Sequence, residues 1–437
     1  MDILGELLQY FGPHASTRRV VMLGCMLLGI SSGVLGTFAL LRRQSLLGDA
    51  MAHAALPGVC VFFLLTHSKH PVGLLLGALV SGLIGSFLIM QITRHSRIKN
   101  DTAIGLVLSV FFGGGIVLLT VIQQSGAGNQ AGLDNFLFGK AAFLLYEDIM
   151  LIGGMACFLL LIVGLFFKEF KVLSFDAGFA ESLGFPVKRL DALLTSLIVI
   201  AVMIGLQAVG VILMAALLII PAAAARQWTN RLGVMLVLSA GVGALSGMFG
   251  AFFSAIAPKT PTGPIMVLTA SAMLLLSLTF APGRGLLATW LRQRRMKRKI
   301  LIENILKAFY KEAEEEGDTL STVSFERVQR HFQLTAGALK GWCRTLSREG
   351  FLDESANGYA LTQKGHERAE KIVRGHRLWE LYLIRQAEIA DDHVQRDAED
   401  MEHFLSPEII AQLEELLEAE PDQDEISDAS PEGSLSS

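Results

Sequence analysis

The residues with the clearest chemical potential are an acidic and an imidazole side chain inside an apolar run. Asp49 and His53 stand four residues apart in SLLGDAMAHAALPGVCVFFLL, residues 45–65. Residues at this spacing share one face of an α-helix, so a carboxylate oxygen and an imidazole nitrogen could meet at one divalent cation. This ligand mixture suits Mn, Fe(II) or Zn. Pro57 lacks an N–H, which leaves the carbonyl of residue 53 without its helical partner and available as a third ligand.

An ionisable side chain surrounded by lipid requires a specific reason. A carboxylate at the centre of a membrane-spanning helix costs about 2.5–3.5 kcal/mol on insertion scales, so it marks a candidate functional site. The alternative interpretation is an Asp–His pair that satisfies itself between packed helices, with Gly48 and Gly58 allowing a close approach. The spacing alone does not separate these two interpretations.

The elements that must position these residues are membrane-spanning helices. Of the 437 residues, 52% are hydrophobic, which indicates a polytopic all-α membrane protein rather than a soluble core. A helix needs about 20 apolar residues to cross a bilayer. We predict nine such helices, at about 20–41, 46–66, 72–92, 102–123, 148–167, 190–207, 208–226, 231–256 and 263–281. The break at GLQAVG permits two passes within 190–226 but does not require them.

Positive charges between these runs predict the topology, because Lys and Arg are enriched in cytoplasmic loops. With the N-terminus outside, the cytoplasmic face carries Arg42, Arg43, Arg94, Arg97, Lys99, Lys168, Lys171, Lys188, Arg189, Arg226, Arg231 and the cluster from Arg284 to Lys299. The opposite face carries Arg18, Arg19, Lys69, Lys140 and Lys259. We therefore predict a multi-pass protein of the inner membrane with a cytosolic C-terminal third.

Two absent patterns limit the chemistry of the chain. None of the four cysteines forms a C-x-x-C pair, which argues against a disulfide framework and against a thiolate zinc site. No G-x-x-x-x-G-K-[ST] phosphate loop occurs, so the sequence predicts a chain that does not hydrolyse ATP itself.

The composition changes sharply after the last apolar run. Residues 1–283 carry 16 Lys and Arg against 11 Asp and Glu, whereas residues 284–437 carry 21 against 30. The division therefore predicts a membrane domain at 1–283, a basic juxtamembrane linker at 284–299, a helical cytosolic domain at 300–419 and a disordered acidic tail at 420–437.

Within the cytosolic domain, the pattern predicts a winged helix-turn-helix. Three amphipathic helices precede a short hairpin in FLDESANGYALT, and a long helix follows at about 363–386. Two further helices are expected at about 394–405 and 407–419, the second with Ser406 as its N-cap.

Four ordered segments give the membrane domain a family resemblance. GDAMAHAALPG (48–58), FDAGFAESLGFPV (175–187), VGVILMAALLIIPAAAA (209–225) and PTGPIMVL (261–268) resemble segments of permease subunits of bacterial ABC importers for manganese, zinc and iron. The resemblance covers roughly residues 20–282. It departs at Ala52, where the family usually has serine.

The resemblance implies that the chain works as one subunit of a larger transport complex. It implies that Asp49 and His53 line the metal path and that residues 175–187, with Phe175, Asp176, Ala180 and Gly184, form a coupling helix that docks into an ATPase. The implied partners are that ATPase, an extracytoplasmic metal-binding protein and a second permease, either the same chain or a sister subunit. No tightly bound cofactor is expected, since the divalent metal is the cargo.

A second resemblance concerns the cytosolic domain. The winged helix-turn-helix, IVRGHRLWELYL and AEDMEHFLSPEI (398–409) resemble DtxR-like metalloregulators. The resemblance implies a metal site formed by Glu303, His376, Glu399, Glu402 and His403. Glu402 stands where iron-responsive members have cysteine, which favours the manganese-responsive branch. Ile300 replaces a usual acidic ligand, so metal binding should be weakened.

DNA binding by this domain is a weaker expectation. Lys340, Arg344 and Arg348 form a basic stripe on the expected recognition helix. The segment as a whole is nevertheless acidic and follows the membrane domain, and affinity for DNA rests mainly on positive charge meeting phosphate. A regulatory metal sensor or a dimerisation module therefore fits better than a DNA-binding regulator.

The sequence thus predicts a permease of an ABC importer for a divalent transition metal, with manganese ahead of zinc and iron. One alternative is a secondary metal transporter driven by an ion gradient. Another is a membrane-anchored, metal-dependent transcriptional regulator whose helices serve only as a tether.

Overall fold

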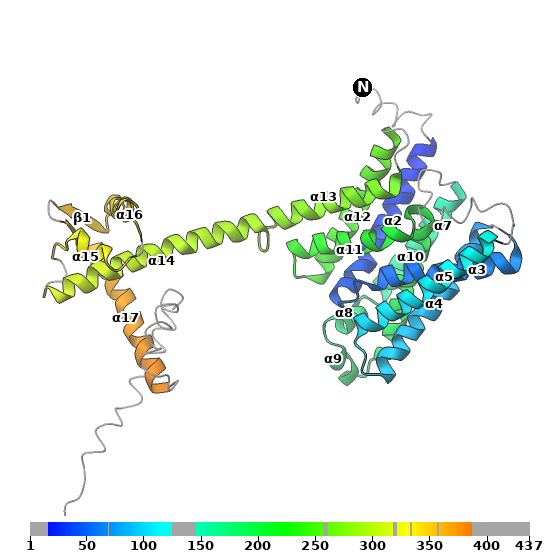
Figure 1. The fold of residues 1–437 in the computed structure, drawn as a ribbon, viewed down its shortest axis with the longest axis horizontal. Coiled ribbons are helices and arrows are strands. Elements are labelled where there is room, and N and C mark those ends of the chain that lie inside the picture. Colours follow the sequence, from blue (N-terminus) through cyan, green and yellow to red (C-terminus); the bar gives the residue numbers. More distant parts are fainter. Residues whose placement is uncertain are drawn as a thin grey trace, which may run out of the picture. The chain divides into compact units, whose positions relative to one another are not determined.

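A computed structural model describes most of the chain. The described residues are 16–68, 70–124, 146–256, 261–317, 321–332, 334–355 and 358–386. They belong to two compact units, Met1–Thr289 and Trp290–Ser437, each of which is described by itself (Figure 1).

The first unit is a bundle of apolar helices. Eight helices within the described ranges are long and apolar enough to cross a membrane. They are α2 (Ser16–Leu41), α3 (Leu47–Thr66), α4 (Pro71–His95), α5 (Asn100–Gln124), α7 (Tyr146–Leu165), α10 (Val187–Val209), α12 (Leu232–Ile256) and α13 (Thr262–Phe280). A shorter apolar helix, α11 (Val211–Trp228), follows α10 directly. All nine predicted runs are therefore helical, and the two helices within 190–226 are separated at Gly210, whose φ of 90° interrupts the helix.

Glycines allow the most extensive contact between two helices of the described bundle, that of α2 with α12. A Cβ at Gly29 would lie 2.0 Å from the carbonyl oxygen of Gly243, and a Cβ at Gly243 would lie 2.0 Å from that of Gly29. Ser239 then donates a 2.6 Å hydrogen bond to the Gly33 carbonyl. Small residues replace hydrophobic attraction as the basis of helix association in lipid, so this backbone contact is a main determinant of the bundle.

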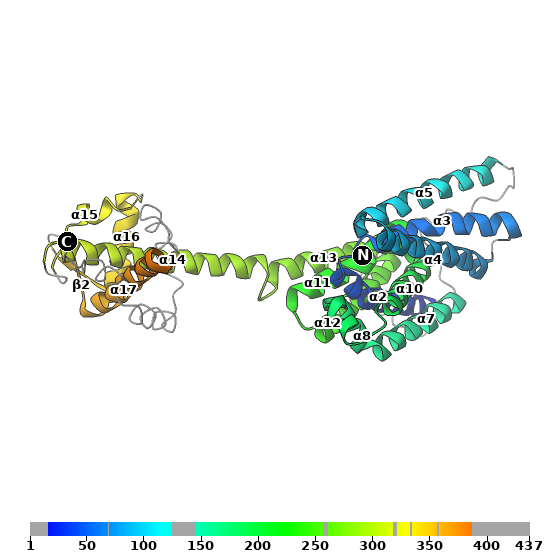
Figure 2. The ribbon, with the colours of Figure 1, turned by 90° about the horizontal axis from the view of Figure 1, so that it is seen from below.

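Helices α3, α4 and α5 lie side by side at one edge of the bundle (Figures 1 and 2). Gly58 of α3 and Gly77 of α4 permit a second close approach, because a Cβ at Gly58 would lie 2.1 Å from the Gly77 carbonyl oxygen. Two short helices, α8 (Phe167–Phe175) and α9 (Ala177–Ser182), join α7 to α10.

The second unit contains the predicted winged helix-turn-helix. Its elements are α14 (Leu286–Glu315, which begins just before the unit), α15 (Phe325–Gln329), α16 (Ala336–Arg348), β1 (Leu352–Ser355), β2 (Gly358–Leu361) and α17 (Gln363–Gln386). The strands are antiparallel, with Leu352 opposite Leu361, and Val323 forms a further bridge to Tyr359. The basic run at 284–299 is largely helical, because α14 passes through it without a break.

An apolar core joins these elements. Leu339, Cys343 and Leu346 of α16 are fully buried and pack with Phe309 of α14 and Val373 of α17. Burial raises the pKa of the Cys343 thiol to about 11. The three α16 residues lie on one face of the helix. This face packs into the core, and the opposite face of α16 is exposed and polar.

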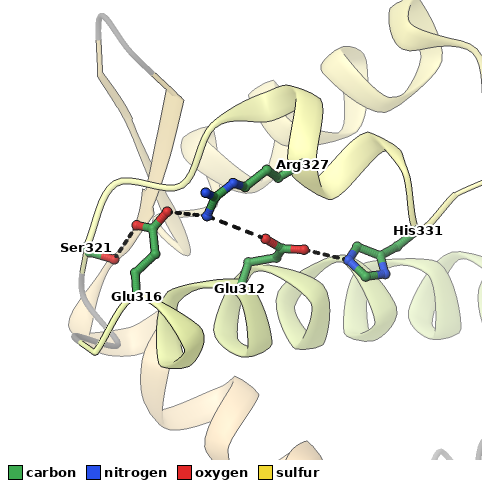
Figure 3. A network of polar contacts seen from close by, with 5 residues as sticks. All are labelled: Glu312, Glu316, Ser321, Arg327 and His331. Carbon is green, nitrogen blue, oxygen red and sulfur yellow. Dashed lines mark hydrogen bonds and ion pairs between the residues drawn. The ribbon is translucent and has the colours of Figure 1, made fainter.

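A polar network holds α15 against α14 (Figure 3). His331 Nε2 lies 2.7 Å from Glu312 Oε1, and Arg327 Nη1 lies 2.5 Å from Glu316 Oε1. Arg327 also lies 4.0 Å from Glu312 Oε2. Glu312 belongs to α14 and Glu316 directly follows it, while Arg327 belongs to α15 and His331 follows that helix, so the network connects α15 to the end of α14.

Candidate functional site

Asp49 and His53 lie together on α3, as predicted. His53 Nε2 is 3.5 Å from Asp49 Oδ1, and the side chains are 21% and 37% exposed for His53 and Asp49. α3 begins at Leu47, so Asp49 belongs to its first turn, as the predicted run at 46–66 implies. The partial positive charge of a helix N-terminus favours a carboxylate there, which lowers the cost of placing Asp49 within the bundle.

The imidazole is held by an aromatic neighbour. The ring of His53 meets that of Phe112 on α5 edge to face, with centroids 4.7 Å apart. His53 Nδ1 is buried and has no hydrogen-bond partner within the described residues. The ring is therefore oriented by packing, while neither of its nitrogens is committed to a strong protein hydrogen bond.

Pro57 lies within α3 and does not end the helix. The hydroxyl of Ser81 on α4 donates a 2.6 Å hydrogen bond to the carbonyl of Ala54, the residue after the carbonyl that Pro57 leaves free. A polar contact from α4 thus reaches the helix at the turn that carries His53.

Asp49 and His53 are not joined by a third acidic, imidazole or thiol side chain within the described residues. Across the described ranges, no group of three or more His, Cys, Asp and Glu side chains could hold a metal ion. Asp49 and His53 give two side-chain ligands, and both remain partly exposed. The arrangement fits a half-site open to further ligands, which a transported ion could contact in passing.

In the second unit, Glu303 is engaged by two basic residues. Its side chain is 5% exposed, Arg368 Nη2 lies 2.5 Å from its Oε1, and Lys299 Nζ lies 4.0 Å away. Sequence reasoning missed Arg368, because it lies 65 positions from Glu303 with no shared local pattern. The side chain of His376 and the residues Glu399, Glu402 and His403 lie outside the described residues.

Two family models match the chain. The ABC 3 transport family matches residues 15–281, more than half of the chain. The chain belongs to the ABC 3 transport family. The iron dependent repressor, metal binding and dimerisation domain matches residues 362–432. Both predicted resemblances are confirmed.

One relative of this ABC 3 family member aligns over both parts of the chain, and another aligns over about two thirds of it. The manganese transport system membrane protein MntC of Bacillus subtilis (strain 168) is 46% identical over 385 residues, which are 88% of each chain. That alignment exceeds the ABC 3 match, so it must extend into the C-terminal third. The zinc transport system membrane protein TroC of Treponema pallidum (strain Nichols) is 47% identical over 280 residues, 64% of this chain and 94% of that protein.

A solved structure has a similar fold. PsaBC from Streptococcus pneumoniae in complex with Fab gives a TM-score of 0.54 at 34% identity, over 63% of this chain and 94% of that chain. The covered share corresponds to the size of the ABC 3 match, so the helical bundle accounts for the similarity in fold.

The segment expected to dock an ATPase is an ordered surface feature of this family member. Asp176 caps α9 by accepting a 2.9 Å hydrogen bond from the Phe179 N–H, and Ala180 is buried. Gly184 has a φ of +82°, a conformation that favours glycine. Phe175 is 57% exposed, and Phe179 and Leu183, which the sequence analysis did not single out, are 55% and 56% exposed. Phe179 and Leu183 stand four residues apart, a spacing that could have indicated a shared apolar face, whereas the extended Asp176 separates Phe175 from them.

The predicted basic stripe occupies the open face of α16. Lys340, Arg344 and Arg348 are all exposed, opposite the buried residues Leu339, Cys343 and Leu346. The geometry brings the three side chains to one face, as their spacing predicted. Contact of these three residues with DNA is not tested by the structure and stays a prediction.

Proposed function

We propose that the chain is the permease subunit of an ABC importer that carries a divalent transition-metal ion, manganese first, into the cytoplasm. The observation that carries this proposal is the Asp49–His53 pair on α3 within an ABC 3 fold. One carboxylate and one imidazole match the ligand preferences of Mn, Zn and Fe(II). Manganese is placed ahead of zinc because the manganese relative aligns over both parts of the chain.

The path requires more ligands than one chain supplies. Both side chains are partly exposed, and the described residues offer no third His, Cys, Asp or Glu beside them. A second permease, the same chain or a sister subunit, would complete the site by facing α3. Each permease would then contribute one Asp49–His53 half-site. Such a shared site suits transport, since an ion must be bound strongly enough to enter and weakly enough to leave.

Energy and delivery would come from other subunits. The chain has no phosphate loop, so a separate ATPase would hydrolyse ATP and would dock on Phe175, Phe179 and Leu183 around the capped helix α9. An extracytoplasmic metal-binding protein would deliver the ion on the opposite side. The loop charges support a cytoplasmic position for α9 and for the C-terminal unit.

The C-terminal unit would regulate the permease according to cytosolic metal. Its proposed ligands are Glu303, His376, Glu399, Glu402 and His403. In the described unit Glu303 is paired with Arg368, so metal would have to displace that guanidinium. About 1.4 kcal/mol of differential binding already shifts a two-state equilibrium tenfold. Deletion of 300–437, or Glu402→Ala with His403→Ala, should remove inhibition at high metal and leave uptake at low metal unchanged.

Reconstitution tests the proposed function. The permease, its ATPase and the binding protein are placed in liposomes, and ATP-dependent uptake of Mn²⁺, Zn²⁺ and Fe²⁺ is compared. Asp49→Ala and His53→Ala should each lower uptake at least about tenfold, the equivalent of about 1.4 kcal/mol of lost stabilisation. Asp101→Asn removes an exposed carboxylate from the start of α5 and serves as the matched control.

Three results would contradict the proposal. Full uptake by the Asp49→Ala/His53→Ala variant would remove the site assignment. Uptake without the ATPase would favour a secondary transporter. Absence of uptake by the wild-type complex, with metal-dependent DNA binding by the chain, would favour a membrane-anchored regulator.

A further inference from the structure

A basic pocket lies between α14 and α17 in the second unit. Its volume is about 610 Å³, within the range of about 300–1,000 Å³ that is usual for small-molecule sites. Six of the side chains that line it are cationic and three are acidic, so the lining carries an excess of positive charge. The charged lining consists of Arg295, Arg298, Lys299, Glu303, Glu349, Lys364, Glu367, Arg368 and Lys371.

The sequence brings these charges together on two helix faces. Residues at i, i+3, i+4 and i+7 share one face of an α-helix. The lining of α14 begins at Arg295 and that of α17 begins at Lys364, and both continue at these spacings. Like charges on one helix face repel each other, so an anion between the two faces would relieve an unfavourable arrangement.

Ion pairs within the unit neutralise only part of this charge. Arg298 Nη2 lies 2.9 Å from Glu349 Oε1. Glu303 Oε1 lies 2.5 Å from Arg368 Nη2 and 4.0 Å from Lys299 Nζ. Two of the three acidic side chains of the lining are therefore already engaged.

The remaining cations exceed the remaining acidic group. Glu367 is the third acidic side chain, and Arg295, Lys364 and Lys371 are the other cationic ones. Lys364 Nζ lies 4.2 Å from the ring centroid of Phe351. Arg295 and Lys371 are exposed and have no ion-pair partner among the described residues. One belongs to α14 and the other to α17, so a ligand that meets both would span the two helices.

The chemistry of the pocket fits a phosphate group. A guanidinium can hold two phosphate oxygens at once, and an ammonium adds a point charge. A cleft lined by one sign of charge concentrates ions of the opposite sign. Ile302, Leu306 and Phe351 form the apolar part of the lining, which suits the uncharged portion of a ligand larger than a simple ion.

We propose that this pocket binds a phosphate-bearing anion that bridges α14 and α17 through Arg295 and Lys371. The phosphate belongs either to a soluble phosphorylated compound or to an anionic lipid headgroup, because Arg295 is part of the predicted juxtamembrane linker at 284–299. The bound anion stabilises the winged-helix unit, since a ligand that binds only the folded state favours that state. The proposal does not depend on the imported metal.

Hydrogen exchange of the full-length protein tests the soluble source. The chain is placed in phosphatidylcholine nanodiscs in metal-free buffer, and pyrophosphate is added at an ionic strength held constant with NaCl. Pyrophosphate should slow exchange of the α14 and α17 amides that flank the pocket. Arg295→Gln/Lys371→Gln should raise its Kd at least about tenfold.

The matched control removes the same charge outside the pocket. Arg292 and Lys297 are exposed residues of α14 that do not line it. Arg292→Gln/Lys297→Gln should change the Kd by no more than about twofold, because their charges act only through screened solvent. Exchange of the α16 amides without ligand verifies that the variants are folded. Lys371→Gln alone should give an intermediate Kd.

Nanodiscs that also contain phosphatidylglycerol test the headgroup source. Protection of the same amides that appears with this lipid, without pyrophosphate, and is lost in Arg295→Gln/Lys371→Gln supports a headgroup in the pocket. Protection by pyrophosphate in phosphatidylcholine supports a soluble ligand. Absence of protection in both arms overturns the proposal, as does equal protection by NaCl or equal loss in the lining and control variants.

Discussion

The guanidinium of Arg368 lies 2.5 Å from the carboxylate of Glu303, and the pair joins α17 to α14. Glu303 is nearly fully buried, whereas Arg368 is 49% exposed. A buried carboxylate needs a compensating charge, and Arg368 supplies that charge to Glu303.

Loss of Arg368 should weaken the winged-helix unit. Arg368→Met keeps an aliphatic stem but removes the guanidinium that lies beside Glu303, while Lys299 stays 4.0 Å from the carboxylate. We expect a destabilisation of about 1–3 kcal/mol, the cost of removing one partner of a buried polar group. Hydrogen exchange of the α14 and α17 amides in the full-length protein measures this effect. Arg368→Met/Glu303→Gln should recover part of the protection, and equal exchange in wild type and Arg368→Met would show that the pair contributes nothing.

The edge-to-face contact of His53 with Phe112 should influence transport through ring orientation. Phe112→Leu removes an aromatic contact of about 0.5–1.5 kcal/mol, so we expect Mn²⁺ uptake to fall about two- to tenfold. Asp49→Ala should remain the more severe change. Phe158→Leu on the exposed face of α7 is the matched control. Unchanged uptake in Phe112→Leu would mean that the ring is held by other contacts.

The cap of α9 should matter for coupling to the ATPase. Asp176→Ala removes the acceptor for the Phe179 N–H, at a cost of about 1 kcal/mol for a helix N-cap. We expect weaker stimulation of ATP hydrolysis by the permease. Asp176→Ser can still cap the helix and should restore stimulation. Normal stimulation in the alanine variant would place the ATPase contact elsewhere.

The Cys343 thiol should resist modification in the folded protein. Its pKa of about 11, compared with 9.0 for a free thiol, lowers the thiolate fraction at pH 8 about a hundredfold. Because the thiolate is the reactive form, iodoacetamide should label Cys343 slowly at pH 8 and more quickly as the pH approaches 11. Peptide mapping by mass spectrometry follows the labelling, and denaturant should remove the protection. Rapid labelling at pH 8 without denaturant would show that the α16 face is accessible.

The helices of both units could be predicted because their signals are local. Apolar runs of bilayer length identified the nine helices. The predicted break within 190–226 coincides with Gly210, whose positive φ separates α10 from α11. The alternation of amphipathic helices and a hairpin likewise indicated the winged helix. The i, i+4 spacing of Asp49 and His53 correctly placed both on one face of α3.

The ion pairs could not be predicted in the same way. Arg42 and Asp191 are 149 positions apart, and Glu303 and Arg368 are 65 apart. Neither pair follows a helical or strand period, so only the packing of α10 near the α2–α3 turn, and of α17 on α14, brings them together.

The mutual contact of Gly29 and Gly243 also constrains how this protein can vary. In a library that randomises single glycine codons and selects clones for metal uptake, neither position can accept even alanine, because an added Cβ would meet the backbone of the other helix at 2.0 Å. No flexible side chain is present at that contact to move aside. Gly113 and Gly114, where an added Cβ meets nothing within 4 Å, should drift freely to other small residues. Selection would therefore retain the two contact glycines as a pair while the codons of Gly113 and Gly114 diversify.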